Sequence, residues 1–241
     1  MANKDIFKNI DVLILCGGQG TRMRPVLADK PKILIDLGGK PFLDILLKNL
    51  ATQGFQRIIL SVGYLKEQII NHFATNTDKK IQIEFATEDT PLGTGGAVKK
   101  AKSLIKSDNF LIMNGDSLCL VDYQKFYENH LDKGALISMV LNKVADTSDY
   151  GEVKLDDGNK IVNFNEKGGG KKSGLISAGI YFMRKNIFSY MPKESNFSLE
   201  YDFFPKILDK PCYGFVSEEE FIDIGTPKKY KRASQLISKL I

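Results

Sequence analysis

Short apolar runs alternate with helix-like segments through the first half of the chain. The runs have the pattern of strands buried on both faces of a sheet, and they cover residues 11–16, 57–62, 81–86 and 110–114. The segments with apolar residues at helical spacing cover residues 42–53, 65–73 and 95–106. Gly54 follows the first of these helices, where glycine commonly ends a helix. This alternation predicts a doubly wound α/β sheet of mostly parallel strands.

From about residue 135 the pattern changes. Strand-like runs follow one another with little helix between them, at residues 135–142, 151–156, 160–165 and 174–183. An Asp-Gly pair between the second and third runs predicts a β-hairpin. Two helical stretches, near 199–209 and 226–240, flank two further strands at 212–216 and 220–224. We therefore expect an antiparallel or mixed extension of the same sheet, within one Rossmann-like domain that covers residues 1–241.

The composition is consistent with one globular domain and argues against a membrane span or a metal-binding cysteine site. The chain has 241 residues, of which 43% are hydrophobic, enough for one large core. No run approaches the roughly 18 apolar residues that cross a membrane, and the N-terminus has no small-residue cleavage signature. The three cysteines, Cys16, Cys119 and Cys212, are odd in number and lack metal-ligand spacing. A reduced, cytoplasmic protein is the expectation.

The charge points toward small anionic ligands. The formal net charge is +5, but no basic run is interleaved with aromatic residues, so nucleic acid is a disfavoured partner. Most lysines are scattered. Local clusters occur at Lys30 and Lys32 and at Lys167, Lys171 and Lys172. The sequence leaves a homo-oligomer open.

A glycine loop follows the first predicted strand. Gly17, Gly18 and Gly20 come at the carboxyl end of residues 11–16, where open α/β sheets bind ligands. Glycines let successive N–H groups point at an anion. The dinucleotide pattern is broken at Met23, and the P-loop pattern is absent. A structural turn is the alternative, but the Thr21, Arg22 and Lys32 that follow favour phosphate binding.

These residues also carry a resemblance. The segment CGGQGTRMRP…KPK…GKP is similar to the signature of the sugar-phosphate nucleotidyltransferases. Ile33 departs from it, because the family commonly has proline there. Further similar segments, in the family's order, cover residues 87–101, 113–117, 149–167 and 221–233. The resemblance implies a nucleotidyltransferase fold, with nucleotide binding in residues 1–134 and sugar-phosphate binding and closing in residues 135–241.

The resemblance implies that a sugar 1-phosphate attacks the α-phosphate of a nucleoside triphosphate and releases pyrophosphate. Arg22 would hold the β- and γ-phosphates and Lys32 the α-phosphate, while Asp116 and Asp223 would bind Mg²⁺. The implied nucleotide-binding residues are Leu15, Gly17, Gly18, Gly20, Thr21, Glu88, Gly93 and Thr94. The implied sugar-phosphate-binding residues are Asn114, Gly151, Glu166, Lys167 and Ala178. Ser177 is a departure, since the family often has asparagine there.

Glu88 suggests which nucleotide is used. Guanine presents two adjacent donors that one carboxylate can accept, whereas uracil and thymine present one. The whole-chain pattern most closely resembles the guanylyltransferase branch that acts on D-glycero-D-manno-heptose 1-phosphate, which implies GTP as donor and GDP-heptose for surface polysaccharides such as capsules. A mannose-1-phosphate guanylyltransferase, a uridylyl- or thymidylyltransferase and a non-catalytic nucleotide-sensing module remain alternatives. A sensing module would be expected to lack Arg22, Lys32 or one of the two aspartates, and all four are present.

Overall fold

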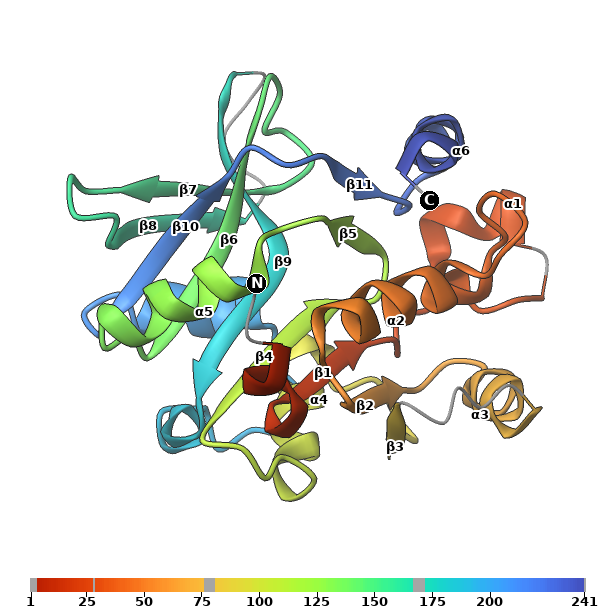
Figure 1. The fold of residues 1–241 in the computed structure, drawn as a ribbon, viewed down its shortest axis with the longest axis horizontal. Helices are drawn as coiled ribbons and strands as arrows, with labels where there is room; N and C mark the ends of the chain where they lie inside the picture. The colour runs from red at the N-terminus through yellow and green to blue at the C-terminus, as the bar shows by residue number, and fades with distance from the viewer. Residues whose placement is uncertain (1–3, 28, 76–80, 167–171, 241) are drawn as a thin grey trace.

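A twisted mixed sheet forms the centre of the protein (Figure 1). The computed structural model describes residues 4–27, 29–75, 81–166 and 172–240. Along the sheet the strands run in the order β10-β6-β9-β4-β1-β2-β3. Their bounds are Cys212–Ser217, Ile137–Val144, Gly174–Arg184, Asn109–Asn114, Asp11–Leu15, Arg57–Val62 and Gln82–Thr87. β1, β2, β3 and β4 are parallel neighbours, as are β6 and β10, whereas β9 runs antiparallel to both β4 and β6.

A hairpin extends the sheet beside β9. β7 (Gly151–Leu155) pairs antiparallel with β8 (Ile161–Glu166), and β7 also pairs with β9. The predicted turn lies between them, and Asn159 adopts a positive φ of 64° there. The last predicted strand does not extend the main sheet. β11 (Phe221–Asp223) pairs instead with β5 (Ser117–Cys119) in a separate two-stranded sheet.

Helices cover both faces of the sheet. They are α1 (Arg24–Leu27), α2 (Phe42–Gln53), α3 (Lys66–Thr75), α4 (Gly93–Lys100), α5 (Tyr123–Asp132) and α6 (Pro227–Leu240). The predicted helix 42–53 is confirmed, including its glycine cap, since Gly54 has a φ of 103°. The prediction of helix over 95–106 was wrong at its end, because a 3-10 turn at Ala101–Ser103 follows α4. The helical stretch predicted near 199–209 is present only in part and is not an α-helix. A π-helical turn and a 3-10 turn occupy Leu199–Lys206, where Pro205 has no N–H to continue a helix.

Two hydrophobic layers follow from the alternation of side chains along the strands. Val12 and Ile14 of β1 lie in one cluster, together with residues of α2, α3, α5 and α6. Leu13 lies in the other cluster, with Val98 of α4 and Phe203. The same alternation runs along β2 and β4. The sheet is therefore buried on both faces, which confirms the doubly wound prediction.

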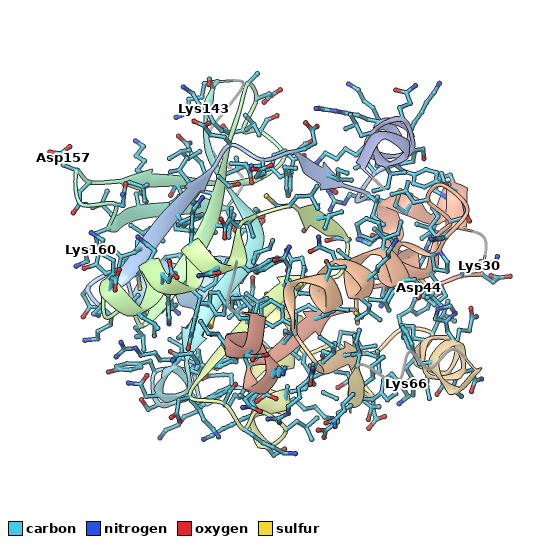
Figure 2. The ribbon with its side chains drawn as sticks, in the orientation of Figure 1. Lys30, Asp44, Lys66, Lys143, Asp157 and Lys160 are labelled. Carbon is cyan, nitrogen blue, oxygen red and sulfur yellow. The ribbon has the colours of Figure 1, made fainter. Side chains whose placement is uncertain are left out.

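The surface is charged and the cysteines are unlinked. Cys16, Cys119 and Cys212 are free and buried. Figure 2 shows charged side chains around the whole periphery, with Lys30 and Lys160 at opposite ends of the molecule. Among the described residues, no helix combines the length and apolar character that a bilayer span needs.

Candidate active site

The glycine loop leaves β1 between its two parallel neighbours, β2 and β4. The N–H of Cys16 donates to the carbonyl of Ser61 at the end of β2 (2.8 Å), and the N–H of Gly115 after β4 donates to the carbonyl of Leu15 (3.0 Å). A Cβ added at Gly17 would lie 3.1 Å from Oε1 of Glu88. Glycine at this position therefore lets the loop lie against the segment that follows β3. Three strand ends converge here, as the sequence predicts.

A cavity of about 580 Å³ opens at this edge of the sheet. Its lining comes from the glycine loop, the 3-10 turn at Lys32, the ends of β2 and β4, and the segment from Glu88 into α4. The predicted site residues in this lining are Leu15, Gly17, Gly18, Lys32, Glu88, Gly93, Thr94, Asn114 and Asp116. Gly20 lies outside the lining and has a positive φ of 59°. A Cβ added at Gly20 would lie 3.3 Å from the Cβ of Lys32. Thr21 begins the 3-10 turn that follows Gly20.

Glu88 is fixed in the wall of the cavity. The residue is 8% exposed, the hydroxyl of Ser61 donates to Oε1 (2.9 Å), and the N–H of Leu92 donates to Oε2 (3.3 Å). Ser61 was not among the predicted site residues. The available signal was a serine near the end of an otherwise apolar strand, RIILSV. These two donors fix the orientation of the carboxylate and leave room for further donors, since a carboxylate has about four acceptor positions.

The glycines of α4 have a packing role that the sequence analysis did not predict. The N–H groups of Gly95 and Gly96 both donate to the carbonyl of Phe197, at 2.9 and 3.2 Å. A Cβ at Gly96 would lie 2.1 Å from the carbonyl oxygen of Ser195. Only glycine lets the segment 195–200 approach this closely. The segment therefore packs against the helix that begins at Gly93 and Thr94, two of the predicted nucleotide-binding residues.

Thr94 is held by the same segment. Its hydroxyl donates to the carboxylate of Glu200 (2.6 Å) and accepts from the N–H of Leu199 (2.8 Å). Both hydrogen-bonding directions of the hydroxyl are therefore used within the protein. Gly93 and Thr94 both line the cavity, and their contact with a nucleotide stays a prediction.

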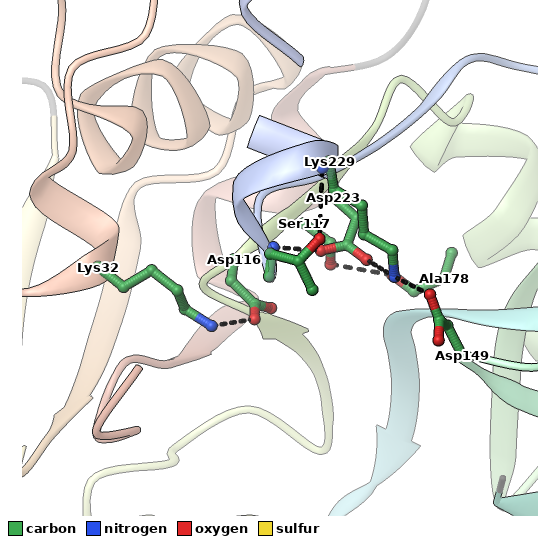
Figure 3. Close-up of polar contacts among 9 residues, drawn as sticks. Lys32, Asp116, Ser117, Asp149, Ala178, Asp223 and Lys229 are labelled. Atoms are coloured by element: carbon green, nitrogen blue, oxygen red, sulfur yellow. Dashed lines mark hydrogen bonds and ion pairs between the residues drawn. The ribbon is translucent and has the colours of Figure 1, made fainter. Parts of the chain in front are cut away.

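Asp116 and Asp223 meet despite their separation in the chain. Asp223 pairs with Ser117 across β11 and β5, and the N–H of Ile224 donates to the carbonyl of Asp116 at 3.0 Å. Each carboxylate forms an ion pair with a lysine (Figure 3). Lys32 contacts Asp116, and Nζ of Lys229 lies 2.8 Å from Oδ2 of Asp223. Burial would lower the pKa of Lys229, but its hydrogen bonds to Asp223 and Tyr150 raise it overall.

This arrangement suits a divalent cation such as Mg²⁺. Two carboxylates on adjacent segments supply the hard oxygen donors that Mg²⁺ prefers, and that ion usually takes only one or two of them from the protein. In the described part of the chain, no group of three or more histidine, cysteine or acidic side chains is placed to hold a metal ion by itself. The donors therefore fit an ion that completes its shell with water and phosphate oxygens rather than one held in a protein cage.

Arg22 lies beside the second carboxylate and outside the lining of the cavity. A Cβ added at Gly225 would lie 2.8 Å from Oδ1 of Asp223 and 3.7 Å from Nη2 of Arg22. Arg22 and Asp223 therefore border the same turn. The guanidinium is brought to the side where α6 begins, close to the expected metal site.

Two of the predicted sugar-phosphate-binding residues lie at β9, with Ala178 in the strand and Asn114 at the end of the neighbouring β4. A Cβ at Gly179 would lie 2.5 Å from Nδ2 of Asn114, and the hydroxyl of Ser117 donates to the carbonyl of Ala178 at 3.2 Å. Oδ1 of Asn114 is buried and lacks a hydrogen-bond partner in the described residues. A buried acceptor without a partner is costly, so this oxygen is suited to a ligand hydroxyl.

Gly151 and Glu166 face each other across the hairpin. They are paired in the β7–β8 register, and a Cβ at Gly151 would lie 2.6 Å from Oε2 of Glu166. Ser177, the departure from the family pattern, shares a hydrogen bond with the hydroxyl of Tyr181 (3.0 Å) and accepts from the N–H of Gly179 (3.2 Å). Lys167 lies outside the described residues.

Comparisons with known proteins show which family this chain resembles along its length. The family model described as "Nucleotidyl transferase" matches residues 11–239. A D-glycero-alpha-D-manno-heptose 1-phosphate guanylyltransferase of Aneurinibacillus thermoaerophilus is 38% identical over 96% of this chain and 100% of that protein. A mannose-1-phosphate guanylyltransferase of Mycobacterium tuberculosis is 32% identical over 93% of this chain, which spans 64% of that protein's length. The crystal structure of HddC from Yersinia pseudotuberculosis complexed with GMP-PN is 38% identical, with a TM-score of 0.84 over 95% of this chain and 99% of that one.

Proposed function

The chain belongs to the nucleotidyl transferase family, and we propose that it transfers GMP from GTP to D-glycero-D-manno-heptose 1-phosphate. The products are pyrophosphate and GDP-heptose, a precursor for surface polysaccharides such as capsules, made in the cytoplasm. The observation that carries the proposal is the 38% identity to a heptose 1-phosphate guanylyltransferase along its entire length. The relative in complex with GMP-PN supports a guanine nucleotide.

Glu88 is the residue that selects guanine. Its carboxylate is buried in the cavity wall and already oriented by Ser61 and Leu92. The N1–H and N2–H₂ groups of guanine can donate to its remaining acceptor positions. A uracil or thymine would instead place a carbonyl oxygen beside the carboxylate, which costs binding free energy. Gly93 and Thr94 add backbone contacts to the base.

The glycine loop and the cations hold the phosphates. Leu15, Gly17, Gly18, Gly20 and Thr21 shape the loop, whose N–H groups bind phosphate oxygens. Two like charges about 4 Å apart oppose each other by roughly 4 kcal/mol at an effective dielectric constant of about 20. Lys32 offsets this repulsion at the α-phosphate. Arg22, with its planar fork, binds the β- and γ-phosphates that leave together.

In the reaction an oxygen of the sugar 1-phosphate attacks the α-phosphorus of GTP. The bond from that phosphorus to the bridging oxygen breaks, and its electron pair leaves with pyrophosphate. Such a transfer depends on positioning and charge more than on proton chemistry. Lys32 orients the α-phosphate, and Asn114, Gly151, Glu166, Lys167 and Ala178 hold the acceptor.

Mg²⁺ is the proposed cofactor, with Asp116 and Asp223 as its protein ligands. When bound, it neutralises charge on the triphosphate oxygens. The two aspartates are supported by their contact through Ile224 and by their oxygen-only donor set. Lys32 and Lys229, which contact these carboxylates in the protein alone, have to share them with the ion.

A mannose-1-phosphate guanylyltransferase is the second candidate. The Mycobacterium tuberculosis relative of that activity favours it, and both activities use the same nucleotide.

The test of the proposed heptose activity incubates the protein with GTP, Mg²⁺ and the manno-heptose 1-phosphate, and identifies the product by mass. We expect one GDP-heptose per pyrophosphate released, and none with Asp116→Asn. Absence of any nucleotide sugar from folded wild-type protein would contradict the proposal.

A further inference from the structure

Lys229 lies in the first turn of α6 with its ammonium among two carboxylates and an aromatic ring. Nζ is 2.8 Å from Oδ2 of Asp223, 3.5 Å from Oδ2 of Asp149 and 3.9 Å from the centre of the Tyr150 ring. The side chain is 18% exposed. Figure 3 shows it reaching from α6 across to Asp149. A lysine this enclosed is held in one place rather than free in solvent.

The partners of Lys229 belong to two different sides of the site. Asp223 ends β11 and lies beside Asp116 through the β5–β11 pair. Asp149 and Tyr150 directly precede Gly151, which is the first residue of β7 and a predicted sugar-phosphate-binding residue. The Tyr150 ring also packs edge-on against Phe221 of β11, with ring centres 5.9 Å apart. Lys229 thus links β11, which ends in the candidate metal ligand Asp223, to the segment that leads into the β7–β8 hairpin.

Asp223 has an orienting hydrogen bond besides its contact with Lys229. Its Oδ1 accepts the N–H of Gly225 at 2.5 Å, within its own turn. What Lys229 adds is positive charge on the other oxygen, Oδ2, and that charge repels a divalent cation that approaches the same carboxylate. An uncharged residue in place of Lys229 would remove this repulsion from Oδ2.

We propose that Lys229 is a positioning residue that serves as the internal counter-ion of Asp223 and ties this carboxylate to Asp149 and Tyr150. Two effects follow. The protein without substrates binds divalent cations weakly at Asp223, because Lys229 already occupies Oδ2. The segment before β7 is held in its acceptor-binding position by the same ammonium. The role of Asp223 in this inference rests on the proposed function.

The first test titrates Mn²⁺ into substrate-free protein by calorimetry. Lys229→Met keeps the length of the side chain and removes the charge, and we expect Mn²⁺ to bind at least about fivefold more tightly. Lys229→Gln, a second uncharged variant that can still donate to Asp223, should do the same. The matched control is Lys228→Met, an exposed neighbour on the same helix, which should bind like wild type. Adding Asp223→Asn to Lys229→Met should abolish the gain. Unchanged or weaker binding in both uncharged variants would overturn the inference.

The second test measures substrate dependence. Lys229→Met and Tyr150→Leu should each raise KM for the sugar 1-phosphate by about threefold to tenfold, and the double variant no further, because both remove one link. Tyr150→Phe keeps the ring beside the ammonium but removes the hydroxyl that Lys229 also contacts, so its KM for the sugar 1-phosphate should lie between those of wild type and Tyr150→Leu. KM for the nucleotide should stay within about twofold in all of them. Fully additive effects, or equal effects on both substrates, would contradict the link. If no sugar phosphate is turned over at all, the proposed function fails, and the Mn²⁺ titration still decides the role of Lys229.

Discussion

Ile224 donates its backbone N–H to the carbonyl oxygen of Asp116 at 3.0 Å. This hydrogen bond continues the pairing of β11 with β5 and brings the two candidate metal carboxylates to one place. The closing segment of the chain therefore completes a site whose other half follows β4. α6 is fastened there as well, because the hydroxyl of Tyr230 donates to the carbonyl of Asp36 in the turn before α2.

Lys32 should be required for turnover and dispensable for folding. Its ammonium contacts Asp116, and its side chain is 14% exposed in the wall of the cavity. Lys32→Ala should lower kcat by about 10²- to 10³-fold, as expected when a preorganised charge beside a reacting phosphate is lost. The melting temperature should change little. Pyrophosphate release and thermal unfolding measure the two effects, with the exposed Lys30→Ala as control. A variant with near-normal kcat would remove Lys32 from the reaction.

Glu88 should discriminate guanine by its two donors. Inosine triphosphate lacks the N2 amino group, so wild-type protein should prefer GTP to it by about tenfold or more in kcat/KM. Glu88→Gln can accept fewer donors at this position and should reduce that preference to within about threefold. Competition between the two nucleotides measures the ratio directly. If the preference is the same in both proteins, Glu88 acts on the fold of the 88–92 segment and does not read the base.

Two glycines of the site should respond in opposite ways to the same substitution. A Cβ at Gly96 would lie 2.1 Å from the carbonyl of Ser195, whereas a Cβ at Gly18 meets nothing within 4 Å. Gly96→Ala should lower the free energy of unfolding by about 1–3 kcal/mol, because backbone has to move. Gly18→Ala should leave stability unchanged and raise KM for the nucleotide, since its methyl group fills the phosphate loop. Denaturant unfolding and steady-state kinetics on both variants check this pair, and a stable Gly96→Ala would contradict the packing role.

His130 should make the fold sensitive to mild acid. It is fully buried between Ser138 and Asn109, and burial, with the nearby Arg184, lowers its pKa from 6.5 to about 4. The unfolded chain binds a proton at the ordinary pKa while the folded chain does not. Stability is therefore present above about pH 6.5 and is lost as pH falls toward 4, by at most about 3 kcal/mol.

The measurement for His130 is urea unfolding at several pH values in that window. His130→Gln should be less stable than wild type near neutral pH but should lose less stability on acidification. His72→Gln is the control, because His72 is paired with Asp44 on α2 rather than buried in the core. An equal acid loss in wild type and His130→Gln would assign the sensitivity to other groups.

Much of the fold could be predicted because it depends on local pattern. The strand at 57–62 and the helix at 42–53 agree with the sequence expectation, since alternation, helical spacing and a glycine cap are written into neighbouring residues. The convergence of Gly17, Glu88 and Asp116 could also be predicted, because the ends of parallel strands meet at one edge. The family resemblance supplied the role of both aspartates as metal ligands, which stays a prediction.

The remainder depends on tertiary contacts that leave no periodic signal. The pairing of β11 with β5 joins two strands of three residues, too short for a pattern to specify a partner. The packing of residues 195–200 on α4 could not be predicted, because the GTGG segment lies within a stretch that resembles a nucleotide-binding motif. In the structure Gly95 and Gly96 also make room for Phe197 and Ser195. Lys229 could not be identified either, since a lysine on a polar helix normally faces solvent.

The most direct test of the central claim is pyrophosphate release with Mg²⁺ across a matrix of nucleotides and sugar 1-phosphates. The donors are ATP, GTP, CTP, UTP and dTTP, and the acceptors include the manno-heptose, mannose and glucose phosphates. We expect the highest kcat/KM for GTP with the manno-heptose 1-phosphate, by about tenfold or more over every other pair. A preference for mannose 1-phosphate would contradict the acceptor, and a preference for UTP or dTTP would contradict the guanine selection assigned to Glu88.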